Sequence, residues 1–357
     1  MKQSRKRGQA AAKFLMGFCA LSMSFHLKAG AFELPRHIGN LGDSMTAGAL
    51  ADFKRQDFKL PWTEIKLLVK LLQFGATKDI AKVEARQLSW AGGYDKNQNV
   101  YSHSHRLSAI SGLDHQMPTA NVAVSGNESR HMWDQAMRLN EWSENNFDQA
   151  YPDYVTLMIG PNDICQDRTQ DMVPVRDYHA NISQVVDEVL SQSPRSKILL
   201  GSVPNIESLR NVAKDKYLHV GLTCEKMWKT IKLCHTLTTE ESPNERAKIA
   251  QRVIDYNDAL QDIADSRSQS YGDRVRLSRA AYGVDFTADD LSVDCFHPNV
   301  IGQEKLADVS FSDSWWADEW PRVKERLEAQ KAEKERKRCS RRIRSGPRGR
   351  FRKPPGC

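Results

Sequence analysis

The chain has 357 residues, of which 40% are hydrophobic, and a formal net charge of +7 at pH 7. A chain of this length can bury a core large enough for one sizeable domain. The charge is uneven, because residues 322–357 carry fifteen Lys or Arg against four Glu, and residues 1–14 carry five Lys or Arg and no acidic residue. The segment between these ends is therefore acidic, and the overall charge does not indicate specific nucleic-acid binding.

The first 31 residues have the pattern of a secretory signal peptide. Basic residues precede an apolar run from Phe14 to Phe25, which is short for a membrane span. Ala29-Gly30-Ala31 then fits a cleavage site of small residues. We therefore expect a secreted or periplasmic protein whose leader, residues 1–31, is removed. An uncleaved anchor is the alternative.

Short apolar runs alternate with amphipathic segments through the acidic part of the chain. Runs of this kind, apolar throughout, are typical of strands in a parallel sheet that is covered on both faces. We expect strands over 36–43, 120–124, 154–159, 197–203 and 275–278. We expect helices over 58–73, 128–139, 178–190, 247–264 and 300–309, the first of them packed or acting as a lipid-facing lid. Irregular structure is expected over 96–115, whose histidines then lie in a loop, and over 204–243.

Small and polar residues lie within three residues of the ends of three of the expected strands. Ser44 follows the first strand, Gly126 the second and Asn162 the third. Because ligands bind at the carboxyl ends of parallel strands, we expect these residues to share one site. A serine needs a base and an orienting partner before it can attack an ester, and the loop Asp294-Cys295-Phe296-His297 offers both. The pattern indicates a serine ester hydrolase.

Four blocks in this order resemble the GDSL or SGNH hydrolase family. They are Gly42-Asp43-Ser44, Gly126, Gly160-Pro161-Asn162-Asp163 and Asp294-Cys295-Phe296-His297. Three longer stretches resemble the phospholipase B-like branch of that family, namely 88–93, 121–126 and 294–298. The resemblance covers about residues 38–312 and implies a three-layer α/β/α, flavodoxin-like fold with a central parallel sheet.

The resemblance also implies the roles of individual residues. Ser44 is the nucleophile, His297 is the general base, and Asp294 orients His297. The backbone amides of Ser44 and Gly126 and the side chain of Asn162 form the oxyanion hole. No metal and no cofactor is implied.

The chain departs from the family pattern at two positions. Met45 stands where the family name has Leu, and Pro161 stands where small residues are usual. Proline has no backbone N–H, so it provides no extra donor next to Asn162. A metal site at Cys295 and His297 is the competing interpretation of the last block, but the spaced Cys or His partners of a zinc site are missing.

Six cysteines follow the predicted leader. An exported chain meets an oxidising compartment, where disulfides form. Cys224 and Cys234 are close in sequence and could close a local loop, and Cys165 and Cys295 could join the two loops that flank the site. Free thiols are the alternative. The remaining two, Cys339 and Cys357, lie in the C-terminal tail.

These observations divide the chain into a signal peptide over 1–31, a hydrolase domain over 32–320 and a basic tail over 321–357. We expect an exposed helix over 322–338 and disorder from 339 onward. The cationic tail would attract an anionic membrane surface or another polyanion. A solvated extension, or a contact with the acidic body, would explain the same composition.

We expect the enzyme to act on carboxylic esters of lipids, as a lipase or phospholipase-like esterase, through an acyl-serine intermediate. A carbohydrate O-deacetylase is an alternative, because this fold does not determine the substrate. A non-catalytic protein that binds surfaces or polyanions through its tail is a second alternative. The intact set of site residues argues against a non-catalytic protein.

Overall fold

The structure is a computed structural model, and it describes residues 33–52, 84–219 and 222–345. The predicted signal peptide and the helix predicted over 58–73 lie outside these residues. Across the described helices, no apolar stretch is long enough to cross a membrane.

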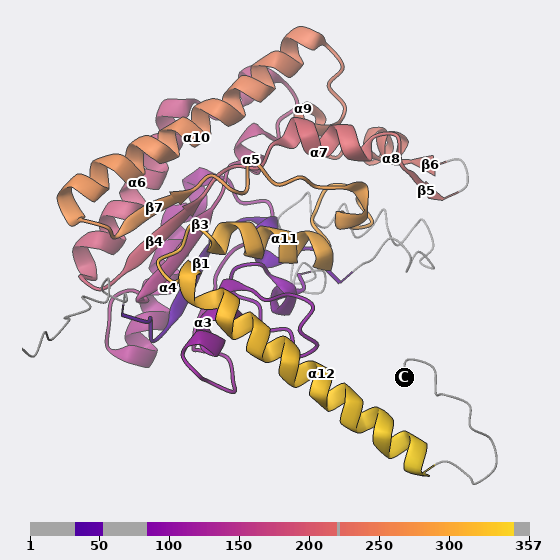
Figure 1. Ribbon diagram of the computed structural model, residues 1–357. Coiled ribbons are helices and arrows are strands. Elements are labelled where there is room, and N and C mark those ends of the chain that lie inside the picture. The colour runs from indigo at the N-terminus through magenta and orange to yellow at the C-terminus, as the bar shows by residue number, and fades with distance from the viewer. Residues whose placement is uncertain (1–32, 53–83, 220–221, 346–357) are drawn as a thin grey trace, which may run out of the picture. The chain divides into compact units, whose positions relative to one another are not determined.

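A five-stranded parallel sheet lies at the centre of the described part, in the strand order β2-β1-β3-β4-β7 (Figure 1). Every neighbouring pair in this sheet is parallel, which confirms the predicted parallel sheet. The five strands are β1 (Ile38–Gly42), β2 (Thr119–Asn121), β3 (Tyr154–Met158), β4 (Lys197–Gly201) and β7 (Val275–Ser278).

Helices cover both faces of this sheet, as expected for strands that are apolar on both sides. Alternate residues of a strand point to opposite faces, so Tyr154 belongs to one apolar cluster and Val155 and Leu157 belong to the other. The cluster around Val155 includes residues of α4 (Met132–Phe147), α6 (Val175–Gln192) and α10 (Pro243–Tyr271). The cluster around Tyr154 includes residues of α3 (His103–Ile110), the end of α11 (Val300–Phe311) and the start of α12 (Trp320–Ser345). The fold is therefore the predicted three-layer α/β/α arrangement.

The segment 96–115, expected to be irregular, contains helix α3. Ser102 caps this helix by accepting a hydrogen bond from the backbone N–H of His105. His103 is buried, and its two ring nitrogens bond to the hydroxyls of Tyr154 and Ser310, each at 2.8 Å. The prediction was wrong because a buried, fully hydrogen-bonded histidine such as His103 looks like a loop residue when only polarity is considered.

The segment 204–243, also expected to be irregular, is largely ordered into short elements. It contains α7 (Ile206–Ala213), α8 (Cys224–Ile231), α9 (His235–Thr238) and an antiparallel strand pair, β5 (Tyr217–His219) with β6 (Leu222–Thr223). The three helices have eight, eight and four residues, little more than two turns at most, so their apolar residues are too few for a clear helical period.

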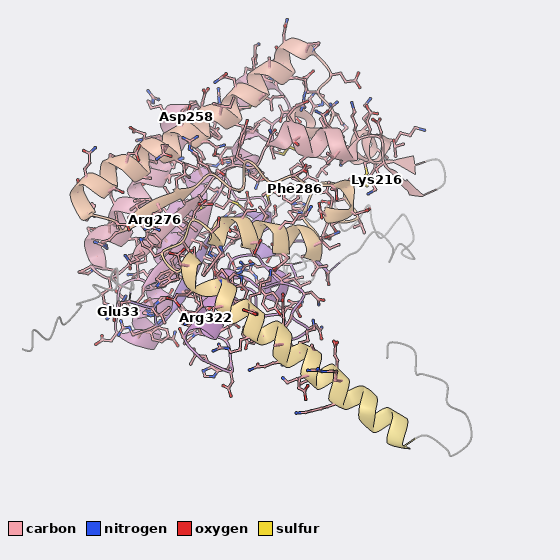
Figure 2. The ribbon with its side chains drawn as sticks, viewed as in Figure 1. Glu33, Lys216, Asp258, Arg276, Phe286 and Arg322 are labelled. Carbon is pink, nitrogen blue, oxygen red and sulfur yellow. A yellow bond between two sulfur atoms is a disulfide. The ribbon has the colours of Figure 1, made fainter. Side chains whose placement is uncertain are left out.

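The tail begins with a helix that is longer than predicted. Helix α12 runs to Ser345, so the predicted disorder is wrong for residues up to 345. Trp320 and Val323 start the helix against the apolar cluster around Tyr154, whereas Arg322, on the first turn, is exposed (Figure 2). Farther along, Glu333 pairs with cations three and four residues later, which supports an exposed helix. Residues 346–357 lie outside the described part.

Short elements complete the described chain. They are α1 (Ser44–Ala47), α5 (Pro161–Ile164), and the 3₁₀ turns Arg86–Leu88, Ser129–His131, Thr169–Asp171, Ala288–Asp290 and Ala317–Glu319.

Candidate active site

Ser44 is the first residue of α1, and Asp43 alone separates it from the end of β1. Gly42 ends the strand with φ +154°, and a Cβ at this position would lie 2.5 Å from the carbonyl oxygen of Met158, so only glycine fits. Asp43 caps α1, because its Oδ1 accepts a hydrogen bond from the backbone N–H of Met45 at 2.9 Å. The side-chain amide of Gln135 bonds both the N–H and the C=O of Gly42, at 2.9 and 2.8 Å. The serine turn is therefore held from the strand side and from α4.

The structure brings Ser44, His297 and Asp294 into one hydrogen-bonded chain. Nε2 of His297 lies 2.8 Å from Oγ of Ser44, and Nδ1 lies 2.5 Å from Oδ2 of Asp294. Oδ1 of Asp294 also accepts hydrogen bonds from the backbone N–H groups of Phe296 and His297, at 3.1 and 3.0 Å. All three side chains are buried. This geometry suits proton transfer from a serine hydroxyl to an imidazole that a carboxylate orients.

The electrostatics of the site favour the protonated imidazole. Burial opposes a charge on His297, but the charge and hydrogen bond of Asp294 outweigh it, and the charge of Asp43 adds to the effect. The pKa of His297 is therefore raised above its ordinary value of 6.5. A base with this pKa can accept the serine proton and hold it during the reaction.

Gly126 and Asn162 lie at the same edge of the sheet as Ser44. After β2, the backbone N–H groups of Val122 and Val124 bond to the carbonyls of Asn40 and Gly42, so the chain follows β1 up to Gly126. Nδ2 of Asn162 donates to the carbonyl oxygen of Asn127 at 2.9 Å, which ties the two loops together. An amide nitrogen carries two hydrogens, and this bond uses one of them.

The loop before Gly126 is also held by two residues that the sequence analysis missed. Oε1 of Glu84 accepts hydrogen bonds from the hydroxyl and the backbone N–H of Ser125, at 2.8 and 3.3 Å. Arg86 pairs with Glu84 at 2.6 Å and donates to the carbonyl oxygens of Asn121 and Ala123. A Glu and an Arg two residues apart are common in any sequence, so no sequence signal distinguishes this pair.

Two further carboxyls are buried next to the site. Asp163 accepts hydrogen bonds from the backbone N–H and the hydroxyl of Ser129, at 3.0 and 2.5 Å. Burial raises the pKa of Asp163 to about 7 and that of Asp43 to about 6. Among the described residues, no hydrogen-bond partner faces Oδ2 of Asp43. The hydrogen bonds of these two carboxyl groups therefore offset only part of the cost of ionising them in a buried position.

Gln303 of α11 connects the serine turn to the loop around Trp90. Its Oε1 accepts from the backbone N–H of Trp90 at 2.9 Å, and its Nε2 donates to the carbonyl oxygen of Met45 at 3.1 Å. Trp90 is only 1% exposed and packs in the core. It therefore belongs to the core packing around the serine turn.

The four cysteines near the site form two disulfides, but in a different pairing from the one considered above. Cys165 pairs with Cys234, and Cys224 pairs with Cys295. The local pair was wrong because Cys224 is the first residue of the eight-residue helix α8, and Cys234 lies beyond the other end of that helix. A helix of that length is roughly 12 Å long, too far for a bridge. Disulfides form in oxidising compartments, so these bridges indicate an extracellular or periplasmic environment.

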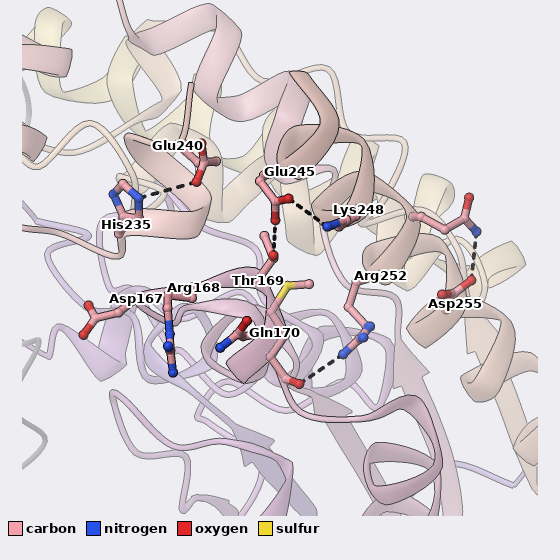
Figure 3. A pocket seen from close by; sticks show the side chains of 12 residues that line it. Asp167, Arg168, Thr169, Gln170, His235, Glu240, Glu245, Lys248, Arg252 and Asp255 are labelled. Carbon is pink, nitrogen blue, oxygen red and sulfur yellow. Dashed lines mark hydrogen bonds and ion pairs between the residues drawn. The ribbon is translucent and has the colours of Figure 1, made fainter. Parts of the chain in front are cut away.

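A polar pocket lies apart from Ser44, between the turn at Thr169, α9 and the start of α10 (Figure 3). Its volume is about 700 Å³, and its charged groups pair with each other, as Glu245 does with Lys248 at 2.7 Å. None of the residues of the Ser44, His297 and Asp294 chain lines it. Within the described ranges, no group of three or more His, Cys, Asp or Glu could hold a metal ion.

One class of serine hydrolases has this architecture, in which a parallel sheet lies between two layers of helices and a Ser-His-Asp chain lies at the carboxyl ends of the strands. The chain belongs to the GDSL-like lipase/acylhydrolase family, whose model matches residues 38–309. Family membership implies an ester hydrolase. No curated protein matches the chain.

Several solved structures are similar to this chain. A family 3 carbohydrate esterase from Clostridium thermocellum is 15% identical, with a TM-score of 0.41, over 78% of this chain and 94% of that one. A catalytic mutant of an acetylxylan esterase from Geobacillus stearothermophilus is 17% identical, with a TM-score of 0.40, over 78% and 95%. A phospholipase A1 from Streptomyces albidoflavus is 14% identical, with a TM-score of 0.39, over 78% and 100%.

Proposed function

We propose that this protein is a secreted or periplasmic serine esterase of the phospholipase B-like branch, and that it cleaves carboxylic esters of lipids. The observation that carries the proposal is the hydrogen-bonded chain from Ser44 through His297 to Asp294. In the proposed domain organisation, residues 1–31 are a signal peptide, 32–320 the hydrolase and 321–357 a basic extension.

In the proposed reaction, Oγ of Ser44 attacks the ester carbonyl carbon while Nε2 of His297 takes the serine proton. The tetrahedral intermediate collapses, and His297 gives the proton to the leaving alcohol. Water then attacks the acyl-serine by the same steps, which releases the acid and restores Ser44. Asp294 holds the imidazole in the tautomer that accepts at Nε2 and stabilises its positive charge.

The proposed oxyanion donors are the backbone N–H groups of Ser44 and Gly126 and the side-chain amide of Asn162. Gly126 has φ +82°, a conformation that turns the backbone sharply after β2. The bond from Asn162 to the carbonyl of Asn127 holds the amide beside that turn. Donors fixed in this way stabilise a developing oxyanion without reorganising during the reaction.

The choice of a lipid substrate is supported by the sequence of residues 88–93, 121–126 and 294–298, which resembles the phospholipase B-like branch. It is also supported by the cationic C-terminal segment, whose helix α12 is largely exposed from Glu328 to Lys337. A cationic segment draws a protein to anionic lipid surfaces. Sedimentation with vesicles that contain anionic lipid, with and without residues 328–357, tests this partner.

The decisive experiment is hydrolysis of a series of p-nitrophenyl acyl esters by residues 32–357, with Ser44→Ala as the control. Activity that rises with acyl length and disappears in the variant supports a lipid esterase, whereas activity confined to the acetyl ester would indicate a deacetylase. Labelling of Ser44 by an organophosphonate would identify the nucleophile directly. A folded protein that neither hydrolyses esters nor takes the label would contradict the proposed function.

A further inference from the structure

The loop that carries Asp294 and His297 is held from outside by helix α8. Nε1 of Trp228 donates a hydrogen bond to the backbone carbonyl of Asp294 at 2.9 Å. One residue farther along, Cys295 forms the disulfide with Cys224, the first residue of α8. Trp228, Cys224 and Cys295 are all buried. Two consecutive backbone positions between the orienting carboxylate and the base are therefore attached to the same helix.

This attachment coincides with an unusual backbone conformation. Cys295 has φ +60°, in the left-handed region that non-glycine residues seldom adopt. The turn at Cys295 lets both backbone N–H groups that follow, those of Phe296 and His297, bond to Oδ1 of Asp294. A residue keeps such a conformation only when its surroundings hold it there. The disulfide and the Trp228 bond provide that hold.

The same segment is also attached to the loop that follows Asn162. Cys234 is bridged to Cys165, directly after α5. The hydroxyl of Thr236, in α9, donates to the carbonyl of Ile164 at 2.6 Å and accepts from the backbone N–H of Gln166 at 3.1 Å. Residues 224–238 thus connect two loops of the site that are distant in sequence, and we call this segment the strap.

We propose that the strap is a positioning element for catalysis, in which Trp228 and Cys224 hold the Asp294–Cys295 backbone so that His297 stays aligned with Ser44. This inference rests on the proposed function. Asp294 is fixed at its main chain by Trp228 and at its side chain by His297, so a rotated Asp294 peptide would move the carboxylate. A displacement of about 1 Å at a catalytic group can lower the rate about a hundredfold.

Trp228→Phe tests the proposal, because it removes the indole N–H and keeps an aromatic ring. We expect kcat to fall about tenfold with KM within about twofold, since the bond acts on alignment and touches no substrate. Trp315→Phe is the matched control. Nε1 of Trp315 donates to the carbonyl of Asp273, also at 2.9 Å, before β7 and away from the serine turn. This control is expected to lower stability and leave kcat unchanged.

A second readout does not depend on activity. In a Ser44→Ala background, the imidazole titration of His297 can be followed by NMR. The charged groups that act on His297 are Asp294 and Asp43, and both remain in the strap variants. Displacement of Asp294 weakens its contribution, so we expect the titration midpoint to move to lower pH in Trp228→Phe and to stay in place in Trp315→Phe. A loss of global stability alone would not move this midpoint.

The two disulfides provide a second matched comparison. The 224–295 bridge spans 71 residues and the 165–234 bridge spans 69. Removing either one should therefore increase the conformational entropy of the unfolded chain by a similar amount. We expect Cys224→Ala with Cys295→Ala to lower kcat and shift the His297 titration. Cys165→Ala with Cys234→Ala should leave that titration in place. Reduction of the Cys165→Ala, Cys234→Ala protein opens the 224–295 bridge without a further substitution and should have the same effect, which covers the case of a Cys224→Ala, Cys295→Ala variant that fails to fold.

The proposal is overturned if Trp228→Phe and the 224–295 pair keep the wild-type kcat and the wild-type His297 titration. A wild-type protein that hydrolyses no ester and takes no label would instead contradict the proposed function. The NMR titration would still report whether the strap positions His297, so the two failures can be told apart.

Discussion

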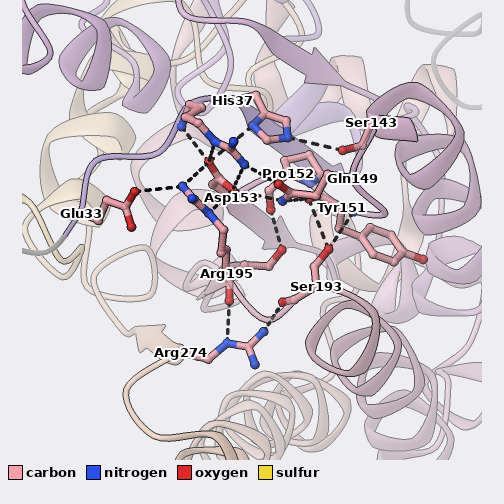
Figure 4. A network of polar contacts seen from close by, with 12 residues as sticks. Glu33, His37, Ser143, Gln149, Tyr151, Pro152, Asp153, Ser193, Arg195 and Arg274 are labelled. Carbon is pink, nitrogen blue, oxygen red and sulfur yellow. Dashed lines mark hydrogen bonds and ion pairs between the residues drawn. The ribbon is translucent and has the colours of Figure 1, made fainter. Parts of the chain in front are cut away.

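Buried carboxyl groups at the two ends of the central sheet differ in how far their neighbours compensate the cost of burying a negative charge. At the amino end, Asp153 accepts hydrogen bonds from the backbone N–H and the guanidinium of Arg36, at 2.9 and 3.0 Å, and from Arg195 and Gln149, at 3.3 and 3.0 Å (Figure 4). Burial opposes ionisation of Asp153, but these partners, with His37, outweigh it and lower its pKa. At this end, the arginines and polar groups around Asp153 therefore compensate its buried negative charge.

At the carboxyl end, Asp163 and Asp43 accept hydrogen bonds from backbone or hydroxyl groups, and within the described residues neither forms a salt bridge. Burial raises the pKa of Asp163 to about 7 and that of Asp43 to about 6. The charge of Asp43 in turn favours the protonated form of His297. The comparison shows that burial alone does not determine the protonation state of a carboxyl group. At the site end, ionising a buried carboxyl group has a free-energy cost that the partners of Asp153 remove at the amino end. We expect changes at the site end to affect rate and changes at the amino end to affect stability.

The largest effect is expected for Asp294→Asn. The amide keeps the shape of the side chain but favours the wrong imidazole tautomer, so kcat/KM should fall on the order of 10⁴-fold. The unfolding free energy should change far less. Asp187→Asn is the control, because it breaks a partly buried 2.7 Å ion pair with Arg267 that joins α6 to α10, and it should leave kcat/KM unchanged. A drop of only a few-fold in Asp294→Asn would remove Asp294 from the proposed site.

The same variant has a pH signature. Because Asp294 raises the pKa of His297, the acid limb of kcat/KM in the wild type should lie above pH 6.5. Removing the carboxylate leaves burial as the largest influence on His297, so the limb should move to lower pH. The measurement is kcat/KM from pH 5 to 9 for both proteins, and an unmoved limb would mean that another group governs the profile.

The next effect is expected for Asn162→Ala, at the same end of the sheet. Loss of one oxyanion donor should lower kcat about 10²- to 10³-fold with little change in KM. Asn140→Ala is the matched control, because Nδ2 of Asn140 also donates to a backbone carbonyl, that of Ala150 at 2.8 Å, on α4. If both variants lose the same activity, the amide of Asn162 has only a structural role.

At the amino end, Asp153→Asn should lower stability and leave kcat unchanged. Breaking a buried ion pair typically costs about 3–5 kcal/mol. Arg36 and Arg195 are 56% and 42% exposed and can be solvated after the change, so we expect a smaller loss of about 2–3 kcal/mol. Urea unfolding measures this loss. A variant with wild-type stability and reduced kcat would reverse the comparison between the two ends.

The sequence predicted two kinds of feature, namely strands marked by apolar runs and site residues marked by sequence blocks in a fixed order. Apolar runs marked the central strands, with β7 placed at its observed bounds, 275–278. The resemblance of the ordered blocks to a known family implied that Ser44, Asp294 and His297 act together, and in the structure they form one hydrogen-bonded chain. Single side-chain contacts with the backbone, such as that of Trp228 with Asp294, leave no period and could not be predicted. The disulfide pairing could not be predicted either, because it depends on where α8 directs its two ends.

The smallest effect is expected in how the unfolding free energy depends on pH, which should differ between the carboxyl groups at the two ends of the sheet. The pKa of Asp163 is raised by burial from 3.8 to about 7, so the folded protein binds this proton more tightly than the unfolded chain does. Its contribution to stability is therefore fully present below about pH 4 and is lost as the pH rises through about 7. Asp163→Asn removes this part of the decline, while Asp43 retains its own decline through about pH 6.

We expect the unfolding free energy of Asp163→Asn, relative to the wild type, to rise on the order of 1–2 kcal/mol between pH 5 and pH 8.5. Asp153→Asn serves as the opposite case. The pKa of Asp153 is lowered, so its contribution is present at neutral pH and is lost only as the pH falls below about 4. Denaturant unfolding of the three proteins at several pH values tests both slopes. Parallel curves for the wild type and Asp163→Asn from pH 5 to 8.5 would show that the carboxyl at the site end is as well compensated as the one at the amino end.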